Sequence, residues 1–180
     1  MAGTFTPGTA TGHTITGSTV VFNGAGAQTI PAFNFNNLTS SNTGARTLAA
    51  SGTIGIAGTF TPGANAYTLT GSTIAYNGTS AQTPPAGFPT YNNLTINNAA
   101  GVSLGANTTA SGLSLSAGSL TTGPSLTMII ASGGSVNLDP KEPTRHYFRA
   151  GLAKGPQLVT VLRVGAGLLP ARQTIRITIE

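Results

Sequence analysis

The chain of 180 residues contains no cysteine and no tryptophan, and only 6% of its residues are charged. The absence of cysteine excludes disulfide bonds, thiolate nucleophiles and cysteine-ligated metal sites. The charged fraction lies far below the quarter or so that is usual for soluble domains. Arg46 is the only charged residue between Met1 and Leu138. This long neutral region must therefore stay soluble through threonine, serine, asparagine and backbone groups.

Acidic side chains are especially scarce, because Asp139, Glu142 and Glu180 are the only three. Enzymes that cleave polysaccharides need carboxylates in pairs or clusters, for acid/base chemistry or to bind Ca²⁺. Asp139 and Glu142 are close in sequence, but Pro140 and Lys141 lie between them and indicate a solvated turn. We therefore predict that the protein is not an enzyme and that it holds no cofactor and no metal.

Long apolar runs and a signal peptide are also missing. No run approaches the roughly 20 residues of a membrane-spanning helix, so we expect no membrane span. No basic segment followed by an apolar stretch comes after Met1, which indicates a mature form or an excised fragment. The net charge of +5 arises mainly after Leu138. Its basic residues are spread out and form no known nucleic-acid module, so we expect no nucleic-acid partner.

An internal repeat dominates the rest of the sequence. The segment Ala-Gly-Thr-Phe-Thr-Pro-Gly occupies Ala2–Gly8 and recurs at Ala57–Gly63. Gly17-Ser-Thr-Val-Val-Phe-Asn-Gly24 is matched by Gly71-Ser-Thr-Ile-Ala-Tyr-Asn-Gly78. Ala27-Gln-Thr29 with Asn36-Asn-Leu-Thr39 is matched by Ala81-Gln-Thr83 with Asn92-Asn-Leu-Thr95. Matched blocks in one order at a fixed period predict a solenoid or an array of β units.

Short segments with alternating apolar residues, rich in Thr, Val and Ile and bounded by Gly, Asn, Ser or Pro, predict strands and an all-β fold; examples are Thr19–Phe22, Leu38-Thr39, Thr73–Tyr76 and Leu94–Ile96. We favour a parallel β-helix with coils of roughly 20 residues, because Leu94, Leu113 and the segment Leu126–Leu138 recur at about that spacing. The alternative is an antiparallel β-sandwich or meander. In that fold, Asn23-Gly24 and Asn77-Gly78 would be hairpin turns.

A boundary is predicted at Asp139. The region 1–138 is read as the β-repeat region, and 139–180 as a charged C-terminal β segment. That segment is interpreted as a cap, a small β module or an edge that pairs with another subunit. Its last stretch alternates isoleucine with polar residues and predicts a half-buried strand. We expect this strand to carry self-association, through Gln173, Thr174, Ile175, Arg176, Ile177, Thr178 and Ile179.

The segments Tyr91–Asn98, Gly101–Asn107 and Leu113–Leu120, together with the Gly-Thr-Phe-Thr-Pro-Gly openings, resemble the β-strand repeats of large exported bacterial surface proteins. Residues 2–138 are thus similar to autotransporter passengers and filamentous-haemagglutinin-type adhesins. The resemblance implies a right-handed parallel β-helix, an extracellular or cell-surface location and a scaffold or adhesive role. It transfers no catalytic residue.

Threonine and asparagine supply the remaining candidate sites. Thr4/Thr6, Thr14/Thr16, Thr59/Thr61 and Thr68/Thr70 each place two hydroxyls on one side of a strand, and stacking them in register would build an ice-binding surface. Asn-x-Thr glycosylation sequons occur at Asn37, Asn77, Asn93 and Asn107. Neighbouring asparagines are also interpreted as turn residues that bond the next coil. His13 is matched by Tyr67 in the second copy, which favours a packing or surface position over a ligand.

From the sequence we expect a non-enzymatic, secreted or cell-surface structural protein that associates with itself through strand edges to form a filament. Open edges of a solenoid are templates for further strands, and a neutral sequence does little to prevent such pairing. The alternatives are an adhesin segment that binds a surface glycan and an ice-binding protein.

Overall fold

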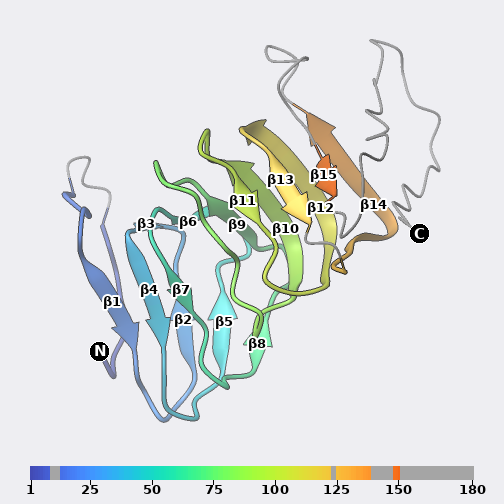
Figure 1. Ribbon diagram of the computed structural model, residues 1–180. Helices are drawn as coiled ribbons and strands as arrows, with labels where there is room; N and C mark the ends of the chain where they lie inside the picture. The colour runs from blue at the N-terminus through green and yellow to red at the C-terminus, as the bar shows by residue number, and fades with distance from the viewer. Residues whose placement is uncertain (9–12, 123–124, 139–147, 151–180) are drawn as a thin grey trace.

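The computed structural model describes residues 1–8, 13–122, 125–138 and 148–150. Within these residues there are fifteen strands and no helix. Every pair of adjacent strands is parallel. The chain is therefore an all-β parallel β-helix, whose strands stack from the N-terminal end toward the C-terminal end (Figure 1). The predicted fold class is confirmed.

The strands form one long sheet and three short ones. The long sheet contains, in spatial order, β14 (Met128–Leu138), β12 (Thr108–Ala117), β10 (Thr90–Asn97), β9 (Thr73–Tyr76), β6 (Ile54–Ile56) and β3 (Asn34–Phe35). The β1 sheet contains β1 (Thr19–Phe22), β4 (Asn37–Ser40) and β7 (Phe60–Thr61). The β2 sheet contains β2 (Gln28–Ile30), β5 (Arg46–Leu48) and β8 (Tyr67–Thr68). The β11 sheet contains β11 (Val102–Ser103), β13 (Leu120–Thr122) and β15 (Phe148–Ala150).

The length of one coil follows from the register of the paired strands. Ile74 pairs with Leu94 on the next strand of the long sheet, and Leu94 pairs in turn with Leu113. Thr19 pairs with Asn37 in the same way in the β1 sheet. One coil therefore takes roughly 20 residues, as predicted and within the range of solenoid repeats. Each coil adds one strand to the long sheet.

The core consists of apolar side chains that stack from coil to coil. On the inner side of the long sheet, Ile54, Ile74, Leu94 and Leu113 are paired in succession and are all buried. A second inner row runs through Phe35, Ile56, Tyr76, Ile96 and Leu115. Burying each such side chain stabilises the fold by roughly 1.5–3 kcal/mol. The alternating pattern of the sequence thus becomes two continuous apolar rows.

The alternative antiparallel fold was wrong, because Asn23-Gly24 lies between β1 and β2 of different sheets, and the strands before and after Asn77-Gly78, β9 and β10, pair in parallel. A two-residue hairpin of type I′ needs positive φ at both central residues. Gly24 and Gly78 do not have it. They are glycines because space is lacking: a Cβ at Gly24 would lie 2.8 Å from Cδ of Gln28, and one at Gly78 would lie 2.3 Å from the Ala57 carbonyl oxygen.

The two copies of the repeat lie on different sheets. Strand β1 belongs to the β1 sheet, whereas its sequence counterpart β9 belongs to the long sheet. The local pairing is nevertheless the same, because Thr19 faces Asn37 in one copy and Thr73 faces Asn93 in the other. The repeat period, from Ala2 to Ala57, is longer than two coils and shorter than three, so the second copy is rotated around the solenoid axis.

The solenoid pairing continues beyond the predicted boundary at Asp139. Strand β15 extends the β11 sheet, with Leu120 paired to Phe148 and Thr121 to Arg149. The backbone of residues 148–150 is thus part of the coil stack.

Candidate functional site

Part of the predicted site lies outside the described residues. This holds for the whole predicted self-association strand, Gln173, Thr174, Ile175, Arg176, Ile177, Thr178 and Ile179. It also holds for Asp139 and Glu142, the only acidic pair that the sequence analysis weighed for catalysis.

The four sequon asparagines all make hydrogen bonds to other coils, and Asn77 reaches past Gly55 to a coil two steps away. Asn37 Oδ1 accepts from the backbone N–H and the hydroxyl of Thr59, both at 2.9 Å. Asn107 Oδ1 accepts from the Thr127 N–H at 2.9 Å. Asn93 Nδ2 lies 3.5 Å from the Thr73 hydroxyl, and Asn77 Nδ2 lies 3.1 Å from Asn34 Oδ1. Asn37 bonds the next coil as interpreted, but it lies in strand β4, and Asn93 lies in strand β10 and bonds the preceding coil, so neither is a turn residue.

The threonine pairs do not stack on one another in the described coils. Thr59/Thr61 flank the buried Phe60 in the β1 sheet, and Thr68/Thr70 belong to the β2 side of the coil. One column of single threonines does form on the outer side of the β2 sheet. Thr29, Thr47 and Thr68 are paired in register and exposed.

A glutamine holds the same corner in both copies. Gln28 Oε1 accepts from the Gly24 N–H at 2.8 Å, and its Nε2 donates to the carbonyls of Met1 and Gly3 at 3.2 and 2.8 Å. Gln82 Oε1 likewise accepts from Gly78 at 2.9 Å, and its Nε2 donates to Ile56 and Gly58 at 2.8 and 2.9 Å. Both glutamines are buried. Residues 1–3 therefore occupy the place that residues 56–58 occupy in the second copy.

Aromatic packing is repeated in the same way. Phe5 and Phe33 have ring centroids 5.3 Å apart, and their counterparts Phe60 and Phe88 are 5.1 Å apart. His13 contacts Phe33 edge-on at 5.4 Å, and its Nε2 lies 2.9 Å from the Pro7 carbonyl oxygen. Tyr67 repeats both contacts, with Phe88 at 4.9 Å and with the Pro62 carbonyl at 3.0 Å. His13 is exposed and packs against the edge of Phe33, in agreement with the predicted packing or surface position.

Arg46 is fully buried, and the sequence analysis gave it no role. Its Nε donates to the Ser40 hydroxyl at 2.8 Å. Its two terminal nitrogens donate to six backbone carbonyls, those of Phe22, Gly24, Gly26, Ser41, Gly44 and Ala45, at 2.7–3.4 Å. The guanidinium therefore satisfies the carbonyls of two successive corners. In the second copy, the buried Asn98 bonds the Ser80 carbonyl, the counterpart of the Gly26 carbonyl.

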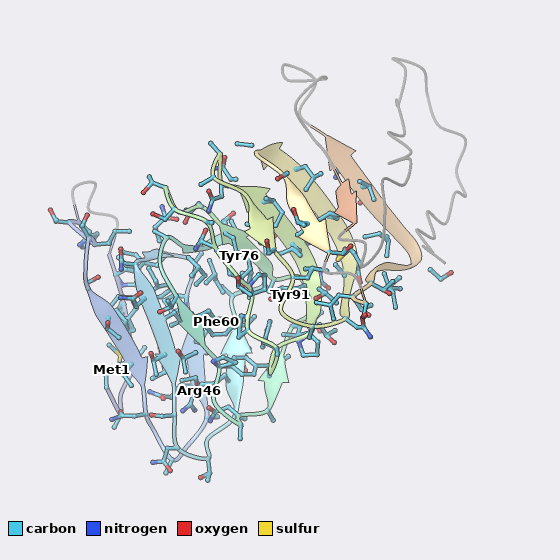
Figure 2. The ribbon with its side chains drawn as sticks, in the orientation of Figure 1. Met1, Arg46, Phe60, Tyr76 and Tyr91 are labelled. Carbon is cyan, nitrogen blue, oxygen red and sulfur yellow. The ribbon has the colours of Figure 1, made fainter. Side chains whose placement is uncertain are left out.

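Tyr76 and Tyr91 form a buried hydroxyl pair between β9 and β10, with their oxygens 3.1 Å apart (Figure 2). Burial raises the pKa of Tyr76 well above 10, and the proximity of Tyr91 adds to this rise. Burial likewise raises the pKa of Tyr91. The counterparts in the first copy are Phe22 and Phe35, whose rings lie 6.3 Å apart without hydroxyls.

The second opening of the repeat is bonded to the coil before it. The N–H groups of Ala57 and Gly58 donate to the carbonyls of Phe35 and Asn36 at 2.9 and 2.7 Å. Thr59 bonds Asn37 as described above, and its carbonyl accepts from the Leu38 N–H at 2.9 Å. On its other side, the Gly58 carbonyl accepts from Gln82 Nε2, so this opening is bonded on both of its sides.

The first opening is paired on one side only. The Met1 carbonyl accepts from the Asn23 N–H at 3.0 Å, and the terminal ammonium of Met1 donates to the Val21 carbonyl. On the other side, the described residues provide no acceptor for the N–H groups of Ala2, Gly3 and Thr4. Phe5 is only partly buried, whereas its counterpart Phe60 is 6% exposed. We call Met1–Thr6 the N-terminal edge.

No family model matches the chain, and no significantly similar curated protein or solved structure was found. The described part of the chain contains no cluster of three or more His, Asp or Glu residues able to hold a metal ion. Among the same residues, no helix is long and apolar enough to cross a membrane.

Proposed function

We propose that the protein is a non-enzymatic, extracellular structural component that joins its β-helix to further copies through strand edges. Backbone hydrogen bonds would then run from one chain into the next and build a stiff rod. The proposed extracellular location rests on the resemblance of residues 2–138 to exported bacterial β-strand repeats.

One observation carries the proposal. The sequence Ala-Gly-Thr-Phe-Thr-Pro-Gly at Ala57–Gly63 stacks on the coil before it through backbone and side-chain hydrogen bonds, and the same sequence stands at Ala2–Gly8. Unpaired strand edges are templates for pairing with another chain. The neutral solenoid supplies almost no charge to oppose this pairing, since Arg46 is buried. An edge that already forms a stable joint inside the molecule is well suited to form one between molecules.

Electron microscopy of the purified full chain over a range of concentrations tests the proposal. We expect filaments that lengthen as concentration rises, because a head-to-tail contact does not close on itself. A chain that ends at Arg172 lacks the predicted association strand Gln173–Ile179 and should form shorter or fewer filaments. Isolated short rods from the full chain at every concentration would contradict the proposal and favour the adhesin alternative, in which a monomeric rod binds a surface glycan.

A further inference from the structure

The chain contains two Asn-Gly pairs, Asn23-Gly24 and Asn77-Gly78, and each directly follows a strand. Asparagine followed by glycine is the pair most prone to deamidation, because glycine has no Cβ to hinder the reaction. The backbone nitrogen of the glycine loses its proton and attacks Cγ of the asparagine, and the side-chain nitrogen leaves as ammonia. Water then opens the resulting succinimide ring, and the products are aspartate and isoaspartate.

In both copies of the repeat, a buried glutamine holds the nitrogen that this reaction needs. The Gly24 N–H donates to Gln28 Oε1 at 2.8 Å, and the Gly78 N–H donates to Gln82 Oε1 at 2.9 Å. Both glycines are buried, so their N–H groups are also shielded from water and hydroxide. The glycine nitrogen is therefore hindered both from losing its proton and from moving toward the asparagine Cγ.

The glutamines are themselves fixed by bonds to other coils. Gln82 Nε2 donates to the carbonyls of Ile56 and Gly58 at 2.8 and 2.9 Å. Gln82 Oε1 also accepts from Asn98 Nδ2 at 2.9 Å. The acceptor oxygen is thus placed by the coils on either side of it. Protection of the Asn-Gly pair therefore depends on the folded solenoid and is absent from the unfolded chain.

We infer that Asn23 and Asn77 are latent deamidation sites, and that Gln28 and Gln82 suppress the reaction at these sites in the folded chain. The reaction would place a carboxylate in a region whose only charged side chain is Arg46. Isoaspartate would also add a methylene group to the backbone and disturb the register with the next coil. The inference concerns the chemical durability of the solenoid and does not depend on the proposed self-association.

The two sites differ in how the asparagine side chain is held. Asn77 is only partly exposed, and its Nδ2 donates to Asn34 Oδ1 at 3.1 Å. This amide packs over Gly55, since a Cβ at Gly55 would lie 2.7 Å from Asn77 Nδ2. Asn23 is exposed, and no hydrogen bond joins its side chain to another described residue. We therefore expect Asn23 to react faster than Asn77 once its glutamine is replaced.

Peptide mapping by mass spectrometry, during incubation of the full chain at mildly alkaline pH, tests the inference. In the folded wild type, both pairs should stay intact over a time in which the chain unfolded in guanidinium chloride converts at both. Gln28→Met should raise the rate at Asn23 by roughly tenfold or more, because loss of a buried hydrogen bond favours local opening. Gln82→Met should raise the rate at Asn77 by a smaller factor.

Each variant carries an internal control, since the other Asn-Gly pair in the same molecule keeps its glutamine and should stay intact. Gln82→Glu retains an acceptor oxygen and should stay closer to the wild type than Gln82→Met. Ile56→Val is the matched control for lost stability. It removes a methyl group from the buried core beside the same corner, leaves the bond between Gly78 and Gln82, and should leave Asn77 intact.

Acceleration confined to the corner that lost its glutamine would support the inference. Equal acceleration at both corners, or as much acceleration at Asn77 in Ile56→Val as in Gln82→Met, would attribute the reaction to general loss of stability and overturn the inference. Unchanged rates in both methionine variants would also overturn it. So would conversion of the folded wild type at the unfolded rate, a comparison that needs no variant. Filament formation is not measured here, so none of these outcomes decides the proposed function.

Discussion

Arg46 shows how a solenoid with almost no charge uses a single buried cation. A buried charge without a partner is strongly unfavourable, but here six carbonyl dipoles surround the guanidinium. The planar fork of arginine reaches carbonyls on both corners at once, which a lysine ammonium cannot do. Arg46 thus joins the first two coils at a point where backbone carbonyls converge.

We expect Arg46→Met to lower the free energy of unfolding by about 3 kcal/mol or more, because buried carbonyls lose their donors. Arg46→Lys should cost about 2 kcal/mol, since part of the donor set remains. Urea unfolding at neutral pH measures both. Thr47→Ala, on the exposed side of the same strand, is the control and should change stability by less than about 0.5 kcal/mol. Wild-type stability in Arg46→Met would refute the role assigned to the guanidinium.

At the scale of strands, the Tyr76–Tyr91 pair joins β9 to β10 through a contact between two hydroxyls, which the first copy lacks. Removing one hydroxyl by Tyr91→Phe leaves the other buried without its partner, at a cost of about 1–2 kcal/mol. The double change to phenylalanine recreates the Phe22–Phe35 pair of the first copy. We therefore expect the double variant to be more stable than the sum of the single changes predicts, as a double-mutant cycle would measure. Strict additivity would contradict the pairing.

The same tyrosines predict a loss of stability in alkali. Their pKa values are raised in the folded chain, so the neutral form is favoured there. The stabilisation is complete below the unfolded pKa of about 10 and is lost as pH rises past that value. Unfolding free energy should fall by up to about 1.4 kcal/mol per pH unit for each tyrosine. The unfolding free energy of the double phenylalanine variant should fall less steeply between about pH 10 and 12. An equally steep fall would mean that other groups cause the loss of stability in alkali.

The sequence predicted those strands whose alternation is clear, such as β1, β4, β9 and the centre of β10. It missed β2, β5 and β6, which are three residues long and contain Gln28, Arg46 or Gly55. A signal was present: Ala27-Gln-Thr-Ile30, Ala45-Arg-Thr-Leu48 and Ala66-Tyr-Thr-Leu69 share one pattern, with the variable residue facing inward. Polar residues at that position are typical of loops in the sequence. The backbone groups that bond them belong to other coils, so the sequence alone does not show that they face inward.

At the scale of the whole molecule, the repeat predicted a solenoid but could not predict its rotation. The period from Ala2 to Ala57 does not give the length of one coil. Each matched block contains a strand, the corner that follows it and the glutamine that bonds this corner, and the two copies of the block lie on different sheets. The N-terminal edge was also invisible in sequence. It became apparent only when Met1 and Gly3 were found in the place of Ile56 and Gly58.

A solenoid is held together mainly by contacts between neighbouring coils, so its stability is close to a sum of such contacts. Gly58 lies in the joint between the second and third coils, where an added side chain has no space. We expect Gly58→Val to weaken this joint by about 1–3 kcal/mol. The coils before it should then open independently, because they retain only their own contacts.

Hydrogen exchange should show faster exchange for β1, β2, β4 and β5, while β10 and β12 keep their protection. Gly3→Val is the control, because a Cβ at Gly3 would meet no described atom within 4 Å. An equal loss of protection along the whole chain would mean that the solenoid unfolds as one unit, and that its coils do not act as separable neighbours.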